Sequence, residues 1–373
     1  MKIACYVSDH GYGHATRSIG LIRALAAEAR GGAVIEVVNH HAYDLLRRAL
    51  APLKSVTVVD RAIDVGFVCF EDRLAYDPGR TALAVHGWIS GWKRFVAEES
   101  ERLRSRPPDF VLTDVAPEPL LVAEKFGVRS AVASNFTWVD QYEPHLRADL
   151  VAPLRGSYAL AECGHAYSMR TALSGVRTIV PAGLVTREPS RPREEVRRQL
   201  GIADGEPLVH LGFGWSADAA ALASQLDAAG LPRDVRLLVS RNLASLGSAT
   251  EWEGRVQAIP ADDTEAHEYI AACDLVIAKA GYGTVAEAIA GRVPVLAVPV
   301  TGSPESEVIA RTVSQLGIGV SYPSDAVVRA PVLDEAAQML SDLGRYRDAF
   351  KRLPPEFAPG AAVRLAHVLI ESI

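Results

Sequence analysis

Two histidines and an aspartate are the side chains in this sequence that could move a proton. His10 and His14 lie in DHGYGHATR, residues 9–17, directly after the apolar run KIACYVS, and Asp114 closes a second apolar run, DFVLTD. The carboxyl ends of parallel strands meet at one edge of a sheet, so Asp114 could hydrogen-bond His14, fix its tautomer and raise its basicity. We therefore predict a catalytic His14–Asp114 dyad. Two alternatives stay open: a packed or helix-capping histidine, and Asp114 as an N-cap or Asx turn before Pro117.

A glycine-rich turn in the second half could bind a phosphate. The apolar run DLVIAKA is followed by Gly281-Tyr282-Gly283, a predicted helix from Thr284 and a second run, VPVLAVP. In a strand–turn–helix–strand unit, the helix N-terminus offers N–H groups and partial positive charge to an anion. Thr284 and Glu287 also fit the S/T-x-x-E capping box, so Glu287 could equally be a cap.

A second turn of the same kind, LGFGWS, ends the apolar run at 208–213 and contains Gly212, Gly214 and Ser216. Two such turns at one sheet edge can hold one diphosphate between them. No lysine follows as in a P-loop, so ATP binding of that type is not supported. Glu305, in the loop after a later apolar run, could accept hydrogen bonds from sugar hydroxyls, or it could be a solvated surface carboxylate.

The first turn does not fit a dinucleotide site. Gly11-Tyr12-Gly13 is too short for G-x-G-x-x-G, because Thr16 occupies the third glycine position. No acidic residue clearly follows the second apolar run at Asn39. An NAD site is therefore disfavoured.

The elements that must position these groups alternate regularly. Apolar, strand-like runs separated by helical periodicity predict α/β architecture with two Rossmann-like domains. A boundary is indicated at 181–192, PAGLVTREPSRP, which concentrates three prolines. We expect domains at 1–185 and 186–355, and a C-terminal helix within 356–373 that could cross back to the first domain. The runs lie at 3–8, 33–39, 56–59, 110–113, 130–133, 208–213, 235–240, 256–259, 275–278 and 293–298.

Residues 61–92 have poor periodicity and many aromatic residues, and we expect a long loop followed by a helix to Arg104. After the fifth run, SNFTW places Phe136 and Trp138 at the same carboxyl edge as His10. These three residues could line an acceptor site, although Phe136 and Trp138 could instead be core.

Bulk composition excludes several classes of protein. The chain has 373 residues, 49% hydrophobic and 23% charged, with a net charge of −6 and no basic stripe, so nucleic acid is an unexpected partner. The four cysteines are scattered without CxxC spacing, which favours buried thiols over disulfides or a metal site. The chain begins with a strand-like run rather than a leader, and no apolar run reaches the about 18 residues of a transmembrane helix. A cytoplasmic protein is expected.

The motifs resemble a known family. GxGH in the first turn and G-x-x-T-x-x-E late in the chain are similar to GT-B glycosyltransferases, in which two Rossmann-like domains face each other across a cleft. They resemble in particular the branch that contains the lipid II-forming N-acetylglucosaminyltransferase. GYGHATR, DFVLTDVAP and SNFTW resemble the glycosyltransferase-like domain fused to L-arabinokinases.

The resemblance implies a role for each matching residue. Glu287 would bind the donor ribose, Arg187 a phosphate, and the backbone near Ile259 the base, while His14 would be the base or transition-state stabiliser. After Pro299 the family usually has Asp or Glu followed by Gln or Asn, whereas this chain reads GSPESE, which leaves open which Glu meets the sugar. The residues expected beside the donor phosphates or sugar are Gly13, Gly212, Gly214, Ser216, Gly281, Gly283, Thr284 and Glu305.

We therefore expect a hexosyl- or hexosaminyltransferase that uses a nucleoside diphosphate sugar, with a UDP-sugar preferred, and a small-molecule or lipid-linked acceptor. The resemblance implies inversion, and helix dipoles with Arg187 would replace a metal, so no cofactor is expected. A hydrolase using water as acceptor, a related epimerase and a nonenzymatic nucleotide-sugar-binding module are the alternatives. A homodimer is left open.

Overall fold

The computed structural model covers residues 1–373 and describes most of the chain as two compact units. The first unit comprises Met1–Arg187, Gly302–Glu305 and Ala358–Ile373, and the second comprises Glu188–Thr301 and Ser306–Phe357. The assignment of Gly302–Glu305 to the first unit was not indicated by the sequence. The residues that the structure does not describe are 71–73, 214–230, 241–242, 246–252 and 324–331.

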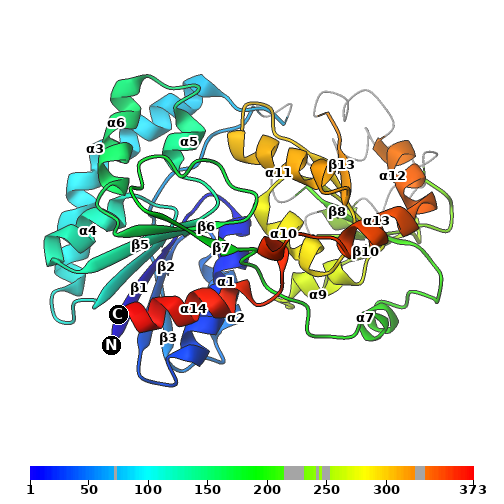
Figure 1. Ribbon diagram of the computed structural model, residues 1–373, viewed down its shortest axis with the longest axis horizontal. Coiled ribbons are helices and arrows are strands. Elements are labelled where there is room, and N and C mark those ends of the chain that lie inside the picture. The colour runs from blue at the N-terminus through cyan, green and yellow to red at the C-terminus, as the bar shows by residue number, and fades with distance from the viewer. Residues whose placement is uncertain (71–73, 214–230, 241–242, 246–252, 324–331) are drawn as a thin grey trace. The chain divides into compact units, whose positions relative to one another are not determined.

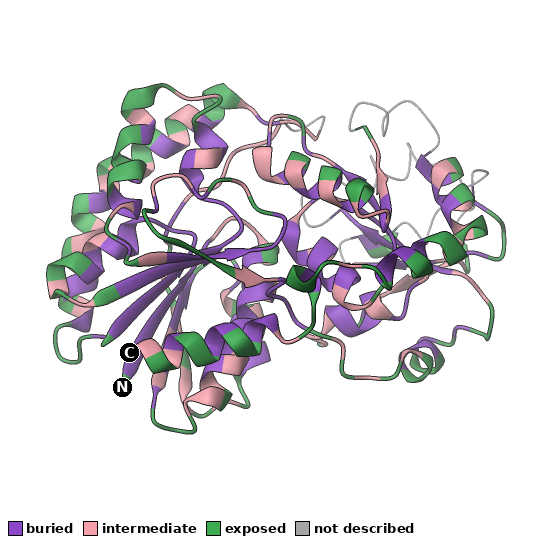
Figure 2. Ribbon diagram, viewed as in Figure 1, coloured by how far each residue is buried: buried purple, intermediate pink, exposed green. Residues whose placement is uncertain are grey.

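The first unit is built on a seven-stranded sheet in the order β3-β2-β1-β4-β5-β6-β7 (Figure 1). All of its pairings are parallel. Its central strands are buried on both faces, as Figure 2 shows, which explains their nearly continuous apolar sequences. The strands are β1 (Lys2–Val7), β2 (Val34–Asn39), β3 (Val56–Asp60), β4 (Phe110–Asp114), β5 (Arg129–Ser134), β6 (Cys163–Tyr167) and β7 (Ile179–Gly183).

Helices cover this sheet, and the first of them begins at the turn after β1. α1 (Tyr12–Glu28) begins directly after Gly11, whose φ of 82° is a conformation that side chains other than glycine rarely adopt. The C-terminal helix α14 (Ala361–Ser372) packs against α1 and β7 in the same unit. The other helices are α2 (Tyr43–Leu50), α3 (Pro78–Leu103), α4 (Glu118–Phe126), α5 (Trp138–Tyr142) and α6 (Ala148–Tyr158).

The second unit repeats the plan with a six-stranded parallel sheet in the order β10-β9-β8-β11-β12-β13. Its strands are β8 (Leu208–Gly212), β9 (Arg236–Val239), β10 (Val256–Ala258), β11 (Leu275–Lys279), β12 (Val295–Val298) and β13 (Gly319–Ser321). Its described helices are α7 (Arg193–Gln199), α9 (Ala266–Ala271), α10 (Tyr282–Ala290), α11 (Pro304–Gln315), α12 (Val332–Ser341) and α13 (Leu343–Phe350), with a short 3-10 turn at Pro355–Phe357; α11 starts in the segment assigned to the first unit.

Each sheet has one point where the strand order reverses. In the first sheet it lies between β1 and β4, and in the second between β8 and β11. Ligands of open parallel sheets bind at such points, outside the carboxyl ends of the strands. His14, Asp114, Gly212 and Gly281 lie at or shortly after the ends of these four strands. Of the other predicted site residues, Phe136, Trp138, Arg187, Ile259 and Glu305 follow other strands.

The structure adds elements that periodicity did not predict. Every strand predicted from an apolar run is present, whereas β6, β7 and β13 were missed: β7 is an edge strand containing Pro181, and β13 has three residues. The predicted loop at 61–92 ends earlier, because Asp77 caps α3 by accepting a hydrogen bond from the Arg80 N–H at 3.0 Å.

Candidate active site

His14 and Asp114 meet at the point where the order of the first sheet reverses. Asp114 is the last residue of β4, and His14 is the third residue of α1 rather than part of an open loop. His14 Nδ1 lies 3.2 Å from Asp114 Oδ1, and both side chains are buried. The N-cap position of α4 is Pro117, so the capping alternative for Asp114 is wrong. The predicted contact is present, and its catalytic role stays a prediction.

Arg17 completes this group and was not singled out from the sequence. Its side chain is 1% exposed, its Nε donates to Asp114 Oδ2 at 2.7 Å, and its Nη2 donates to Asp114 Oδ1. Burial alone would raise the pKa of Asp114, but the charges of Arg17 and His14 outweigh it and hold that pKa well below its usual range. Asp114 is therefore an ionised acceptor at neutral pH. Helical spacing could have found Arg17, because it follows His14 by three residues.

His10 lies just before α1 and is packed among aromatic rings. Its ring centroid is 4.8 Å from that of Phe67 and 5.3 Å from that of Trp138. A Cβ on Gly66 would stand 1.6 Å from His10 Nδ1, so only glycine at position 66 permits this placement. His10 is partly exposed, as an acceptor-contacting residue must be.

Phe136 and Trp138, the other predicted acceptor residues, are fully buried in the hydrophobic core of the first unit. The Phe136 ring meets His14 edge-on at 5.6 Å between centroids, and Trp138 Nε1 donates to Asp64 Oδ2 at 2.7 Å. Both residues are therefore core residues, which is the alternative that the sequence analysis left open. An acceptor-binding role for them remains untested.

Two buried carboxyl groups of the first unit accept hydrogen bonds, one of them from the turn after β1. Asp64 Oδ1 accepts a hydrogen bond from the Asp9 N–H at 2.8 Å, and Glu118 Oε1 accepts one from Trp88 Nε1 at 3.0 Å. Glu118 Oε2 has no hydrogen-bond partner among the described residues. Burial, followed by the charge of Asp64, raises the pKa of Glu118 to about 8, and burial also raises the pKa of Asp64. Asp64 carried no sequence signal, because 61–77 has no periodic pattern, and Glu118, the first residue of α4, was not singled out.

The end of β8 lies beside the end of β11 and the start of α10 in the second unit. Gly212 ends β8 and pairs with Ala278 of β11. A Cβ on Gly212 would lie 3.1 Å from Thr284 Cγ2 and 3.2 Å from the Ala278 Cβ, so a glycine at 212 lets the end of β8 approach the start of α10. Gly214 and Ser216 lie outside the described residues.

Helix α10 begins earlier than the capping box requires. Its N-cap is Gly281, with no side-chain hydrogen bond at the cap, and Gly283 and Thr284 are its second and third residues. The capping-box interpretation of Thr284 and Glu287 is therefore wrong. As at any helix start, the first N–H groups lack acceptors within the helix and can face an anion. Glu287 is buried one turn further along.

The loop after β12 is tied to this turn. Ser306 Oγ donates to the Ala280 carbonyl at 2.9 Å and accepts from the Val300 N–H at 2.9 Å. Glu305 belongs to the first unit, where its Oε1 accepts from Asn135 Nδ2 at 2.9 Å. A donor-sugar role for Glu305 remains a prediction.

The remaining predicted donor residues lie on or after different elements. The Ile259 N–H donates to the Val239 carbonyl at 2.9 Å, so a nucleotide base would have to bind other groups near Ile259. Arg187 is buried at the end of the first unit, and Gly13 is an exposed residue in the first turn of α1.

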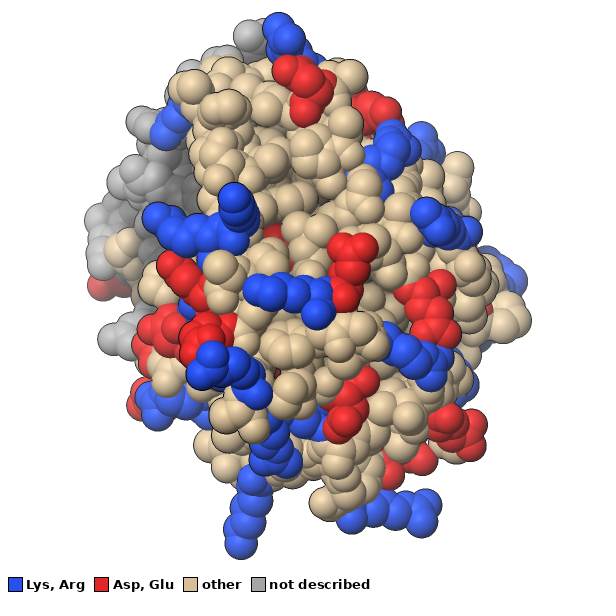
Figure 3. All heavy atoms as spheres, turned by 90° about the vertical axis from the view of Figure 1, so that its left-hand side faces the viewer, with Lys and Arg blue, Asp and Glu red and all other residues tan. Residues whose placement is uncertain are grey.

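Among the described residues, no cluster of His, Cys, Asp or Glu could hold a metal ion. No helix among them is both long and apolar enough to cross a membrane. None of the four cysteines, all of which the structure describes, is in a disulfide. On the face in Figure 3, basic and acidic side chains are mixed.

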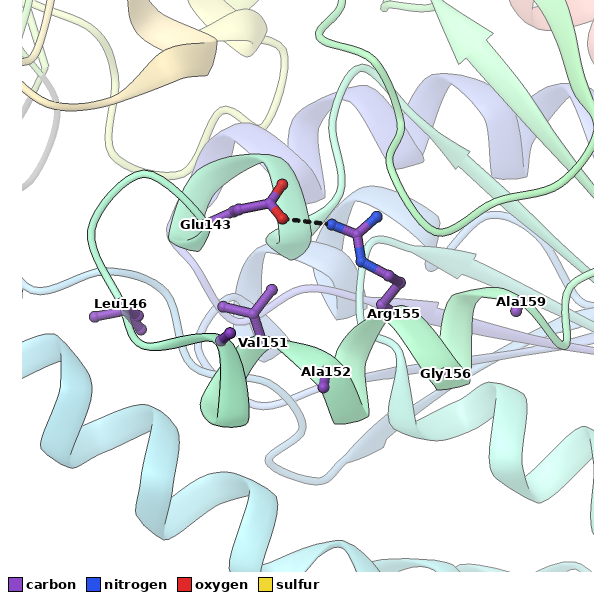
Figure 4. Close-up of a pocket in the computed structure, with 8 residues that line it drawn as sticks. Glu143, Leu146, Val151, Ala152, Arg155, Gly156 and Ala159 are labelled. Carbon is purple, nitrogen blue, oxygen red and sulfur yellow. Dashed lines mark hydrogen bonds and ion pairs between the residues drawn. The ribbon is translucent and has the colours of Figure 1, made fainter.

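A surface cavity of about 480 Å³ lies along α6, lined by Leu146, Val151, Ala152 and the ion pair between Arg155 Nη2 and Glu143 Oε1 at 2.7 Å (Figure 4). It shares no lining residue with the predicted sites.

Solved structures define the class of fold. The chain is similar to the glycotransferase of kitacinnamycin, with 15% identity and a TM-score of 0.69 over 100% of this chain and 99% of that one. It is also similar to CalG4, the calicheamicin glycosyltransferase, with 15% identity and a TM-score of 0.64 over 99% and 97%. The fold is GT-B, as predicted.

Residues 256–327 match the glycosyltransferase family 28 C-terminal domain. The chain is 29% identical over 305 residues to L-arabinokinase of Arabidopsis thaliana, covering 79% of this chain and 28% of that protein. It is 31% identical over 195 residues to the UDP-N-acetylglucosamine--N-acetylmuramyl-(pentapeptide) pyrophosphoryl-undecaprenol N-acetylglucosamine transferase of Thermus thermophilus, covering 50% and 53%.

A third relative is the chloroplastic monogalactosyldiacylglycerol synthase 1 of Arabidopsis thaliana, 36% identical over 120 residues and covering 29% of this chain and 22% of that protein. The chain thus spans between about a fifth and about half of the length of these relatives. The chain is thus similar to members of both groups that its motifs resemble, the L-arabinokinases and the N-acetylglucosaminyltransferases. This similarity does not assign the chain to the lipid II-forming branch.

Proposed function

We propose that this chain is a glycosyltransferase that moves a sugar from a nucleoside diphosphate sugar, preferably a UDP-sugar, to a hydroxyl group of an acceptor. The observation that carries the proposal is the match of residues 256–327 to a glycosyltransferase C-terminal domain, because it contains the turn from Gly281 to Glu287. In this proposal the sugar is a hexose or hexosamine, and the reaction takes place in the cytoplasm.

The second unit would bind the nucleoside diphosphate of the donor. The diphosphate would lie at the start of α10, where N–H groups and the helix dipole favour an anion, beside Gly212. Glu287 would bind the ribose hydroxyls and Glu305 the sugar. Arg187 would help to neutralise the leaving group, so that no metal is needed.

The first unit would supply the base. In the proposed step the acceptor oxygen attacks the anomeric carbon, the bond from that carbon to the diphosphate oxygen breaks, and His14 Nε2 takes the acceptor proton. Asp114 would orient the imidazole through Nδ1 and stabilise the imidazolium. Attack on the face opposite the leaving group inverts the configuration at the anomeric carbon.

The acceptor is proposed by analogy. The name of the Thermus thermophilus relative describes a lipid-linked acceptor and that of the plant synthase a glycerolipid product. A small-molecule or lipid-linked hydroxyl is therefore the proposed acceptor class for this chain.

The test has two stages. A thermal-shift panel of nucleoside diphosphates, their sugars and NAD identifies the donor, and that donor is then incubated with and without acceptors. Acceptor-dependent release of the nucleoside diphosphate supports the proposal. Equal release of free sugar without acceptor identifies a hydrolase, tight binding without turnover identifies a binding module, and stabilisation by NAD alone contradicts the account.

A further inference from the structure

The Nη2 atom of Arg17 faces more acceptors than it has hydrogens. It donates to Asp114 Oδ1, lies 2.9 Å from His14 Nδ1 and lies 3.0 Å from Ser134 Oγ. A guanidinium Nη carries two hydrogens and no lone pair. Three acceptor positions therefore compete for two hydrogens.

The rest of the guanidinium is fixed. Nε donates to Asp114 Oδ2 at 2.7 Å, and Nη1 donates to Asn135 Oδ1 at 2.6 Å. Asn135 is held in turn by Glu305, to which its Nδ2 donates at 2.9 Å. Since the side chain is 1% exposed, Arg17 cannot relieve the competition by turning toward solvent.

The outcome of the competition sets the tautomer of His14. One Nη2 hydrogen is taken by the ionised Asp114. If the second goes to His14 Nδ1, that nitrogen must be unprotonated, so the neutral ring carries its proton on Nε2 and cannot act there as a base. If the second goes to Ser134, His14 can keep a proton on Nδ1, donate it to Asp114 Oδ1 at 3.2 Å and present a lone pair on Nε2.

We propose that Ser134 is a positioning residue, which accepts the second Nη2 hydrogen of Arg17 and thereby holds His14 in the tautomer that can act as a general base. The value of this tautomer for turnover rests on the proposed function, whereas the tautomer itself does not. Ser134 is suited to the role because it is the last residue of β5, fully buried, and its Oγ can accept a hydrogen bond.

The test reads the tautomer directly. Long-range proton–nitrogen NMR correlations on protein with labelled histidines distinguish a protonated from an unprotonated ring nitrogen, at a pH about two units above the ordinary histidine pKa of about 6.5. A His14→Asn variant assigns the signal by its loss. His210 is an internal reference, because its Nδ1 lies 3.0 Å from the Leu238 carbonyl oxygen, which can only accept, so its Nδ1 is protonated.

Wild-type His14 is expected to match the His210 pattern, with the proton on Nδ1. Ser134→Ala is expected to move the proton to Nε2, while Ser130→Ala, the same change on the same strand, leaves it on Nδ1. Wild-type protein with the proton on Nε2, or an unchanged tautomer in folded Ser134→Ala, overturns the proposal. The wild-type spectrum tests the proposal even if Ser134→Ala does not fold.

Turnover supplies a second readout. Ser134→Ala should lower kcat by about 10² or more, within the about 10²–10⁴ that a general base contributes, with the KM values unchanged. A tautomer change without loss of kcat would contradict the positioning role. If the wild-type protein shows no sugar transfer at all, the proposed function fails, while the tautomer result still stands or falls by the spectra.

Discussion

His14 Nδ1 and Asp114 Oδ1 lie 3.2 Å apart, although 100 residues separate them in the sequence. The contact exists because β1 and β4 are neighbours at the point where the sheet order reverses, so that the turn after β1 and the last residue of β4 share one edge. The same topology in the second unit brings Gly212 against Thr284. Two short segments in each unit thus carry the candidate base with its carboxylate partner and the candidate diphosphate turn.

Gly212→Ala should weaken binding of a nucleoside diphosphate by about tenfold or more, which corresponds to about 1.4 kcal/mol. The new Cβ would stand 3.0 Å from His210 Nε2 and 3.1 Å from Thr284 Cγ2, so these side chains, including that of Thr284 at the start of α10, would be crowded. Calorimetric titration gives the dissociation constant. Gly344→Ala is the matched control in the same unit, since a Cβ there meets nothing within 4 Å. Equal affinity in both variants would argue against a diphosphate at this turn.

Gly66→Ala should raise the acceptor KM or lower kcat/KM by about tenfold, while donor binding is unchanged. The added Cβ would overlap the His10 ring, 1.6 Å from Nδ1, and would displace a residue predicted to contact the acceptor. Steady-state kinetics with the acceptor varied provide the measurement. Gly91→Ala in α3, where a Cβ has open space, is the control, and normal acceptor kinetics in folded Gly66→Ala would remove His10 from the acceptor site.

The carboxyl group of Glu118 should make the first unit less stable as the pH rises. Its pKa is raised from 4.5 to about 8 by burial and by the charge of Asp64. Between these values the unfolded chain loses this proton and the folded chain keeps it, so the free energy of unfolding falls from about pH 4.5 to about pH 8 and this contribution is lost above that range.

Glu118→Gln keeps an acceptor for Trp88 Nε1 and removes the titration. We expect its melting temperature to decline less than that of the wild type over this pH range, by at least about 2–4 °C, the shift that about 1 kcal/mol produces in a domain of this size. Glu124→Gln, an exposed change on the same helix, should follow the wild-type curve. Parallel curves for wild type and Glu118→Gln would contradict the raised pKa.

Sequence patterns predicted ten of the thirteen described strands, the two edges and the His14–Asp114 contact, because strand order and the polarity of parallel strands constrain where turns converge. Arg17 could have been predicted, because it follows His14 by three residues and residues three apart on a helix are neighbours. Asp64 was not, because it lies in an irregular segment and contacts Asp9 and Trp138 only through the tertiary fold.

The capping box, the missed strand β7 and the placement of Glu305 each differ from the sequence analysis for a separate physical reason. The capping box at Thr284 assumed that the helix starts there, whereas the extended backbone of Gly281 lets α10 start at Tyr282. The edge strand β7 contains Pro181, which apolar periodicity does not recognise as strand. Glu305 was expected in the second domain, and its assignment to the first unit depends on contacts such as that with Asn135, which no local pattern encodes.

His14→Ala tests the central claim most directly. Donor affinity, measured by calorimetry, should stay close to that of the wild type, because the predicted diphosphate site lies in the second unit. Acceptor-dependent turnover should fall by about 10²–10⁴, the usual contribution of a positioned base. His86→Ala, an exposed histidine on α3, serves as the control and should retain full turnover. Unchanged turnover in folded His14→Ala would contradict the account.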